Sequence, residues 1–131
     1  MIYADTSALA KLIIDEAESV TLKKWLHAHG VPTEEQLATN VIGVVELHRV
    51  ASRWRRVATS ATLLVSRIDK RELTPTAVAL ASEMPPPHLR TLDALHIASA
   101  AELLELSAFV TYDDRMASAA ADYGLPVVSP R

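Results

Sequence analysis

The fold is decided near the start of the chain, where residues 2–14 read IYADTSALAKLII. Ile2–Ala4 is a short apolar run, which predicts a buried strand. The polar residues Asp5–Ser7 follow it at once, and side chains of this kind cap helices. Residues 8–14 then have the composition of a helix. The stretch therefore predicts a buried strand that passes directly into a helix.

The rest of the chain repeats this alternation of short apolar strands and helices. Further strands are predicted at residues 36–39, 70–74, 108–112 and 126–128, and helices at 16–29, 41–57, 61–68, 75–83, 91–106 and 116–123. The helix at 91–106 is apolar around most of its surface, so we expect it to be central. This order indicates one α/β domain over residues 1–131, with a parallel sheet covered on both faces.

Composition excludes several classes of protein. The 131 residues include no cysteine, which excludes a disulfide framework and thiolate metal sites. Three glycines are too few for a glycine-rich phosphate loop. The chain starts without a basic leader, and no apolar run approaches the roughly 18 residues of a membrane span, so we expect a cytoplasmic protein without a membrane partner. A net charge of −3 argues weakly against a broad phosphate-binding surface.

Four acids stand where a ligand site is expected. Asp5 and Asp113 follow predicted strands, and ligands bind beyond the carboxyl ends of parallel strands. Glu46 and Asp93 interrupt apolar stretches of two predicted helices. Each acid alone has an ordinary explanation: two helix caps, one favourable helix dipole and one solvent-facing side chain. Together, carboxylates in apolar surroundings are costly unless they are paired or bound to a cation.

A divalent metal would remove the repulsion within such a cluster. Two carboxylates about 5 Å apart repel by roughly 3 kcal/mol at an effective dielectric of about 20. Oxygen ligands alone favour Mg²⁺ or Mn²⁺ over zinc. An ion held in this way can activate water and stabilise the charge that develops in phosphodiester hydrolysis.

Four stretches of the chain resemble the motifs of PIN-domain nucleases, most closely those of VapC toxins. The matching residues are 2–9, 46–49, 90–98 and 110–115, followed by a closing strand at 124–127. Their order and spacing cover essentially the whole chain. The resemblance implies a PIN-like three-layer α/β/α fold with a short, mostly parallel central sheet.

The same resemblance implies an activity and its partners. It implies an Mg²⁺-dependent endoribonuclease, with Mn²⁺ as the other possible metal, that cleaves RNA phosphodiester bonds with a metal-activated water. Such an enzyme is the toxin half of a type II toxin–antitoxin pair. It is usually a homodimer that a VapB-type antitoxin neutralises.

Residue roles can be carried over by position. Asp5, Glu46, Asp93 and Asp113 would be the catalytic acids that hold the metal, with Asp5, Asp93 and Asp113 as its direct ligands. Thr6 or Ser7 matches the small hydroxyl residue near the metal.

His96 and Asp114 are auxiliary candidates. His96 lies three residues after Asp93 and could be a general base, although a packing or supporting role is the commoner one. Asp113 and Asp114 are adjacent at a strand end, so their side chains point to opposite sides. Asp113 shares its side with Thr111, and Asp114 shares its side with apolar residues. We therefore expect Asp113 to be the fourth acid, with Asp114 favouring the start of the next helix.

Three arginines follow Glu46 at helical spacing. Arg49, Arg53 and Arg56 would lie on the same face of the helix predicted at 41–57. This face either contacts RNA or the antitoxin, or is simply solvated.

Other functions compete with this interpretation. A receiver-like phospho-acceptor would need a lysine after a late strand, but the last lysine is Lys70. A non-catalytic binding domain with the same fold is disfavoured by the presence of all four acids. A PIN-domain nuclease that processes RNA or acts on DNA stays open, because the motifs do not select the substrate.

Overall fold

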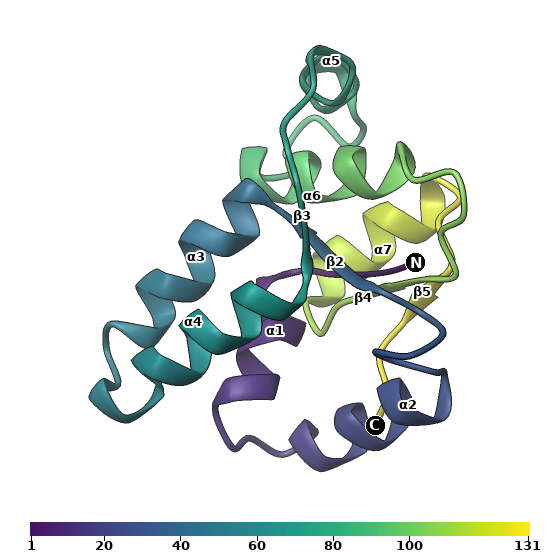
Figure 1. The fold of residues 1–131 in the computed structure, drawn as a ribbon. Helices are drawn as coiled ribbons and strands as arrows, with labels where there is room; N and C mark the ends of the chain where they lie inside the picture. Colours follow the sequence, from purple (N-terminus) through teal and green to yellow (C-terminus); the bar gives the residue numbers. More distant parts are fainter.

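Five short strands form one sheet at the centre of the computed structural model (Figure 1). The structure describes residues 1–131 apart from the side chain of Arg55. The strands are β1 (Ile2–Ala4), β2 (Leu37–Asn40), β3 (Asp69–Arg71), β4 (Ala108–Val110) and β5 (Val127–Val128). Their order across the sheet is β3-β2-β1-β4-β5, and every neighbouring pair is parallel. The predicted parallel sheet is therefore confirmed.

Helices cover both faces of this sheet, as predicted for a three-layer α/β/α fold. One layer contains α1 (Thr6–Ile13), α2 (Ser19–Ala28), α3 (Val41–Ala51) and α4 (Ala58–Arg67). The other contains α5 (Pro75–Glu83), α6 (Thr91–Ala101) and α7 (Asp114–Asp122). In Figure 1, α3 and α4 lie side by side as a hairpin that extends away from the sheet. None of the helices that the structure describes is long and apolar enough to cross a membrane.

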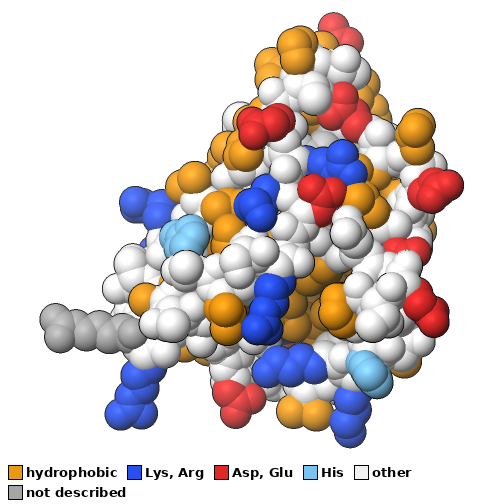
Figure 2. All heavy atoms as spheres, viewed as in Figure 1, with side chains coloured by type: hydrophobic (Ala, Val, Ile, Leu, Met, Phe, Trp, Pro, Cys, Tyr) orange, Lys and Arg blue, Asp and Glu red, His pale blue; other side chains and the backbone are white. Residues whose placement is uncertain are grey.

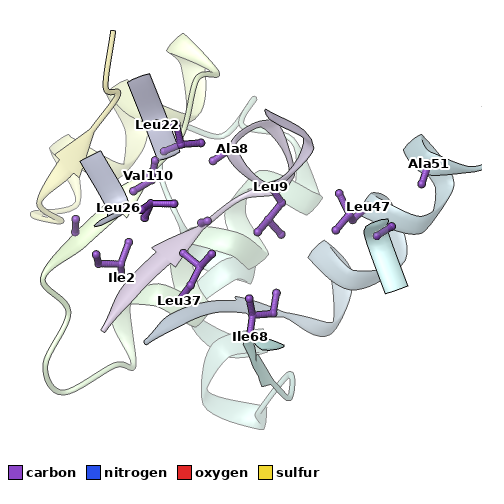
Figure 3. Close-up of a cluster of buried hydrophobic side chains, with 13 residues drawn as sticks. Ile2, Ala8, Leu9, Leu22, Leu26, Leu37, Leu47, Ala51, Ile68 and Val110 are labelled. Carbon is purple, nitrogen blue, oxygen red and sulfur yellow. The ribbon is translucent and has the colours of Figure 1, made fainter. Parts of the chain in front are cut away.

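Alternation along the strands divides the buried side chains into two cores, because successive residues of a strand point to opposite faces. The core under α1–α4 holds the strand residues Ile2, Ala4, Leu37, Ala108 and Val110 (Figure 3). The core under α5–α7 holds Tyr3, Ala38 and Phe109. In this second core the rings of Tyr3 and Phe109 stack with their centroids 5.5 Å apart.

The path of the chain through the sheet reverses between β1 and β4. The chain moves from β1 outward to β2 and β3, then returns to β4 on the other side of β1. Such a reversal leaves a crevice outside the carboxyl ends of the two adjacent strands. Asp5 follows β1 directly, and Asp113 follows β4 after two further residues. The fold therefore brings these two acids to one edge of the sheet.

The helix predicted at residues 41–57 is wrong in its second half. α3 ends at Ala51, and a separate 3-10 helix, η1 (Arg55–Val57), leads into α4. The break lets α4 fold back so that its Ala61 joins Ala51 and Leu47 in the buried core. Packing of the two helices therefore overrides the helical periodicity of the sequence.

Three other elements end at least two residues earlier than predicted, including the strand predicted at 108–112, which ends at Val110. The helix predicted at 91–106 ends at Ala101, because the chain must turn to enter β4 beside β1. The strand predicted at 70–74 is β3, at residues 69–71. Thr74 instead caps α5, because its hydroxyl accepts a hydrogen bond from Ala77 N at 3.0 Å.

Gly43 lets α3 approach the sheet and α6 closely. A Cβ atom at this position would clash with Thr39 Oγ1 and lie 3.2 Å from His96 Cε1. We expect Gly43→Ala to lower the free energy of unfolding by about 1–3 kcal/mol, as overpacking does in a filled core. Urea unfolding followed by circular dichroism measures this loss.

A double-mutant cycle supplies the control. Among the described residues, Thr39 Oγ1 is buried without a hydrogen-bond partner, so Thr39→Ala removes the clashing atom and breaks no such bond. In the Thr39→Ala background, Gly43→Ala should cost less than half as much as in the wild type. An equal cost in both backgrounds would locate the strain elsewhere.

Candidate active site

Asp5 is a buried carboxylate at the end of β1 and the N-cap of α1. Its exposed fraction is 1%. Oδ1 accepts hydrogen bonds from Ala8 N at 3.0 Å and from Ser7 Oγ at 2.7 Å, and Oδ2 accepts one from Thr111 Oγ1 at 2.7 Å. Burial raises the pKa of Asp5, and these hydrogen bonds only partly oppose the rise. Asp5 is therefore a helix cap, as one of the two explanations of this residue required. Burial also makes the charged form of its carboxylate unfavourable.

Glu46 reaches the same region from α3. Its Oε1 accepts hydrogen bonds from Thr6 Oγ1 at 2.7 Å and from His96 Nε2 at 2.8 Å. Burial alone would raise the pKa of Glu46, but the bonds from His96 and Thr6 outweigh it and lower the pKa overall. Glu46 is therefore a half-buried, ionised carboxylate held by one oxygen, and it does not simply face solvent.

Asp93 and Asp113 converge on the side chain of Arg90. Arg90 Nε donates to Asp93 Oδ2 at 3.0 Å, and its terminal Nη2 donates to Asp113 Oδ2 at 2.8 Å. Asp93 lies in the first turn of α6 and is buried. Asp113 caps α7 through its other oxygen, which accepts from Arg115 N and Met116 N. One guanidinium thus neutralises two of the four predicted acids.

The two adjacent aspartates have different surroundings. The side chain of Asp113 is 27% exposed and paired with Arg90, whereas that of Asp114 is 98% exposed. Asp114 begins α7 and has only a distant ion pair, at 3.8 Å, with Arg131. Of the two, Asp113 is the one that shares Arg90 with Asp93.

His96 is fully inside the molecule, with an exposed fraction of 1%. Both of its ring nitrogens are engaged, Nδ1 with Tyr3 Oη at 2.8 Å and Nε2 with Glu46. A general base needs a free nitrogen that can reach substrate. The surroundings of His96 favour the supporting role over the base.

The polar groups that these acids offer to a ligand are carboxylate oxygens, which are the donors that hard divalent cations prefer. Among the described side chains, no three acids or histidines gather closely enough to hold a metal ion together. Asp93 and Asp113, however, already direct one oxygen each to a single positive group. Asp5 is linked to them through Thr111, whose hydroxyl also accepts from Asp113 N at 3.1 Å. Carboxylates in this arrangement match the chemistry of Mg²⁺ or Mn²⁺.

Contrary to the prediction, the three arginines Arg49, Arg53 and Arg56 do not lie on one face of a single helix. Arg49 lies on α3 beyond Glu46, whereas Arg53 lies in the turn after the helix and Arg56 lies in η1. All three side chains are exposed. In Figure 2, basic side chains lie mainly over the lower and left part of this view, and acidic ones mainly over the upper and right part.

The sequence analysis missed the roles of Arg90, Tyr3 and Thr111. Arg90 stands within the motif at 90–98, but its spacing from Asp113 gives no sign of a contact. Tyr3 has the pattern of a core residue, and its hydroxyl bond to α6 depends on the tertiary fold. The polar character of Thr111 in an apolar strand was the one available signal, and its hydroxyl does contact Asp5.

Comparisons with known proteins agree on one family. A PIN domain profile matches residues 2–122. Ribonuclease VapC47 of Mycobacterium tuberculosis is 43% identical over 133 residues, spanning 99% of this chain and 97% of the relative.

Solved structures share the fold at lower identity. The sarcin–ricin loop cleaving toxin VapC20 of M. tuberculosis has a TM-score of 0.74 at 21% identity, over 99% of this chain and 100% of that one. VapBC2 from Rickettsia felis, bound to a DNA fragment from its promoter, has a TM-score of 0.74 at 16% identity, with both chains fully covered.

The raised pKa of Asp5 predicts an unusual pH dependence of stability without metal. The folded protein takes up a proton on Asp5 at a higher pH than the unfolded chain does. This contribution to stability therefore increases as pH falls through the folded pKa, and it levels off below the unfolded pKa. Asp5→Asn should make the protein in EDTA more stable at pH 8, since one pH unit of raised pKa corresponds to about 1.4 kcal/mol.

Thermal melts in EDTA between pH 5 and 8 measure this effect. Asp114→Asn is the matched control, because it changes the net charge equally at an exposed position. If Asp5→Asn is instead less stable than the wild type at pH 8, then the ionised cap matters more than the cost of burying its charge.

Arg90 should compete with a metal for Asp93 and Asp113. We expect Arg90→Ala to bind Mn²⁺ roughly threefold to tenfold more tightly, since the variant loses two exposed ion pairs that occupy the oxygens a metal would bind. Isothermal titration with Mn²⁺ measures the change. Arg115→Ala, which removes a nearby exposed arginine, should leave the affinity unchanged, and weaker binding by Arg90→Ala would contradict the competition.

Proposed function

Because the chain belongs to the PIN-domain family, and within it to the VapC ribonucleases of toxin–antitoxin systems, we propose that its four acids form the active site of an Mg²⁺-dependent endoribonuclease. The observation that carries this proposal is the convergence of buried and paired carboxylates at the β1–β4 edge of the sheet. In this proposal the substrate is RNA, and the reaction is hydrolysis of a phosphodiester bond.

The direct metal ligands in this proposal are Asp5, Asp93 and Asp113. Bound Mg²⁺ would supply positive charge that offsets the negative charge developing on the phosphate. Ser7 and Thr111 hold the Asp5 carboxylate in place through its two oxygens. Preorganised ligands of this kind need little rearrangement on binding a cation.

Glu46 would orient the attacking water. Its Oε1 is occupied by Thr6 and His96, and Oε2 has no hydrogen bond among the described residues. An ionised carboxylate accepts hydrogen bonds and donates none. Glu46 Oε2 is therefore suited to accept a hydrogen bond from a water that attacks the phosphate.

We also propose a VapB-type antitoxin as the partner of the α3–α4 hairpin. The structurally similar protein from R. felis was solved as VapBC2, bound to a DNA fragment from its promoter. On this hairpin, exposed apolar side chains lie on α3 (Val45), on α4 (Leu63) and in the connection between them (Trp54), where Arg53 and Arg56 also lie. Such a surface suits an antitoxin segment with apolar anchors and acidic side chains. We propose in addition that this protein forms a homodimer and acts in the cytoplasm.

Membership of this family narrows the alternatives. A receiver-like phospho-acceptor and a non-catalytic domain do not agree with full-length similarity to a ribonuclease. The remaining alternative is a PIN nuclease that processes RNA or cuts DNA. Parallel assays on RNA and single-stranded DNA of the same sequence separate these activities.

Cleavage should require a divalent metal and Asp113, but not Asp114. RNA should be cut with Mg²⁺ or Mn²⁺ and left intact in EDTA. Asp113→Asn should lower the single-turnover rate by roughly 100-fold, as loss of a charge-stabilising group does. Asp114→Asn should stay within about twofold of the wild type, since an exposed helix-terminal acid contributes only a few tenths to about 1 kcal/mol of stability.

The two variants control for each other, because each replaces one aspartate by asparagine at the start of the same helix. Cleavage that persists in EDTA would refute the metal requirement. An inactive Asp114→Asn beside a fully active Asp113→Asn would reverse the assignment of the fourth acid.

A further inference from the structure

A buried chain of hydrogen bonds connects the central sheet to Glu46. Tyr3 Oη on β1 lies 2.8 Å from His96 Nδ1 on α6, and His96 Nε2 lies 2.8 Å from Glu46 Oε1 on α3. Tyr3 and His96 are both essentially inaccessible to solvent. Three elements that are distant in sequence thus meet in one polar chain inside the protein.

The chemistry at its two ends fixes the protons of this chain. Glu46 Oε1 already accepts a hydrogen bond from Thr6 Oγ1 at 2.7 Å, and a carboxylate oxygen that acts as an acceptor pairs with an N–H on His96 Nε2. The phenolic O–H of Tyr3 can donate, and its oxygen lies 2.8 Å from His96 Nδ1. An imidazole with its single proton on Nε2 accepts a hydrogen bond from the Tyr3 hydroxyl at Nδ1 and donates one to Glu46. In this tautomer both nitrogens are satisfied.

Packing holds the imidazole in this orientation. The ring of Tyr3 meets the ring of His96 edge-on at 5.9 Å between centroids and stacks on Phe109 on its other side. Gly43 leaves room for the edge of the imidazole against α3. A ring restrained by its neighbours and by both nitrogens has one available rotamer.

The restrained ring of His96 affects the candidate active site because it bonds the carboxylate of Glu46. Its Oε1 is held from two directions, by His96 and by Thr6. Glu46 also lines a pocket of about 200 Å³ with Arg90, Thr91, Leu92 and Asp93. With Oε1 fixed inside, Oε2 is the oxygen that remains for this pocket.

We propose that Tyr3 and His96 are positioning residues, which fix the carboxylate of Glu46 so that Oε2 is presented to the attacking water. This inference rests on the proposed function for the role of Glu46. It assigns His96 no proton transfer and no contact with substrate. Tyr3 acts one step further away, by fixing the tautomer of His96.

The first arm of the test is spectroscopic and independent of activity. Imidazole ¹⁵N shifts of the full-length protein should show His96 as the neutral Nε2–H tautomer at pH 7.5. Tyr3→Phe removes only the hydroxyl and keeps the stacked ring, so it should shift the Nδ1 resonance. A wild-type His96 with its proton on Nδ1 would overturn the proposal, whether or not RNA is cleaved.

The second arm compares variants of His96 in single-turnover RNA cleavage with Mg²⁺. His96→Leu cannot donate to Glu46 and should lose roughly 10- to 100-fold in rate, the size expected for a misplaced catalytic group. His96→Gln retains an amide N–H that can reach Glu46 and should recover most of that loss. RNA affinity and Mn²⁺ affinity should change by less than threefold in both variants.

Ile97→Val is the matched control for damage to the core. Ile97 is buried on the same helix and has an apolar side chain that cannot bond Glu46, Tyr3 or His96, so the substitution should not lower the rate. Equal rates for the Leu and Gln variants, or losses that only follow melting temperature, would overturn the positioning role. A wild-type protein inactive on RNA with Mg²⁺ would instead refute the proposed function and leave the spectroscopic arm decisive.

Discussion

The burial of a charged carboxylate at the end of β1 is the constraint on which the rest of the site depends. Asp5 is placed there because the strand ends in the crevice between β1 and β4. A buried charge without partners would be expelled or neutralised. The surrounding hydroxyls and the first turn of α1 are arranged to satisfy it. One acid therefore starts a helix, orders its neighbours and leaves the edge of the sheet strongly polar.

Asp113 and Glu46 also combine a structural role with the proposed catalytic role. Asp113 caps α7 with one oxygen and pairs with Arg90 through the other. Glu46 ties α3 to α1 and α6 through a single oxygen. Glu46 keeps its second oxygen without a hydrogen bond among the described residues, and Asp113 directs its second oxygen to Arg90. Cap and ligand are therefore compatible explanations of the same residue.

The sequence predicted the sheet and the helix order, because these follow from local patterns. Ile2–Ala4 with Asp5 marks a strand end, and strand ends of parallel sheets meet at one edge. The break after Ala51 was not predictable, since it depends on α4 packing back on α3. The contact of Arg90 with Asp113 was missed for a related reason. It joins residues 23 positions apart that only the turn of α6 against α7 brings together.

The break after Ala51 also separates two surfaces that a continuous helix would have joined. The tip of the hairpin, residues 52–57, stands away from the sheet (Figure 1) and makes none of the described hydrogen bonds to the four acids. Substitutions at this tip can alter the surface offered to a partner while the acids keep their arrangement. In the proposed pairing with an antitoxin, recognition of the partner and arrangement of the acids would therefore evolve independently of each other.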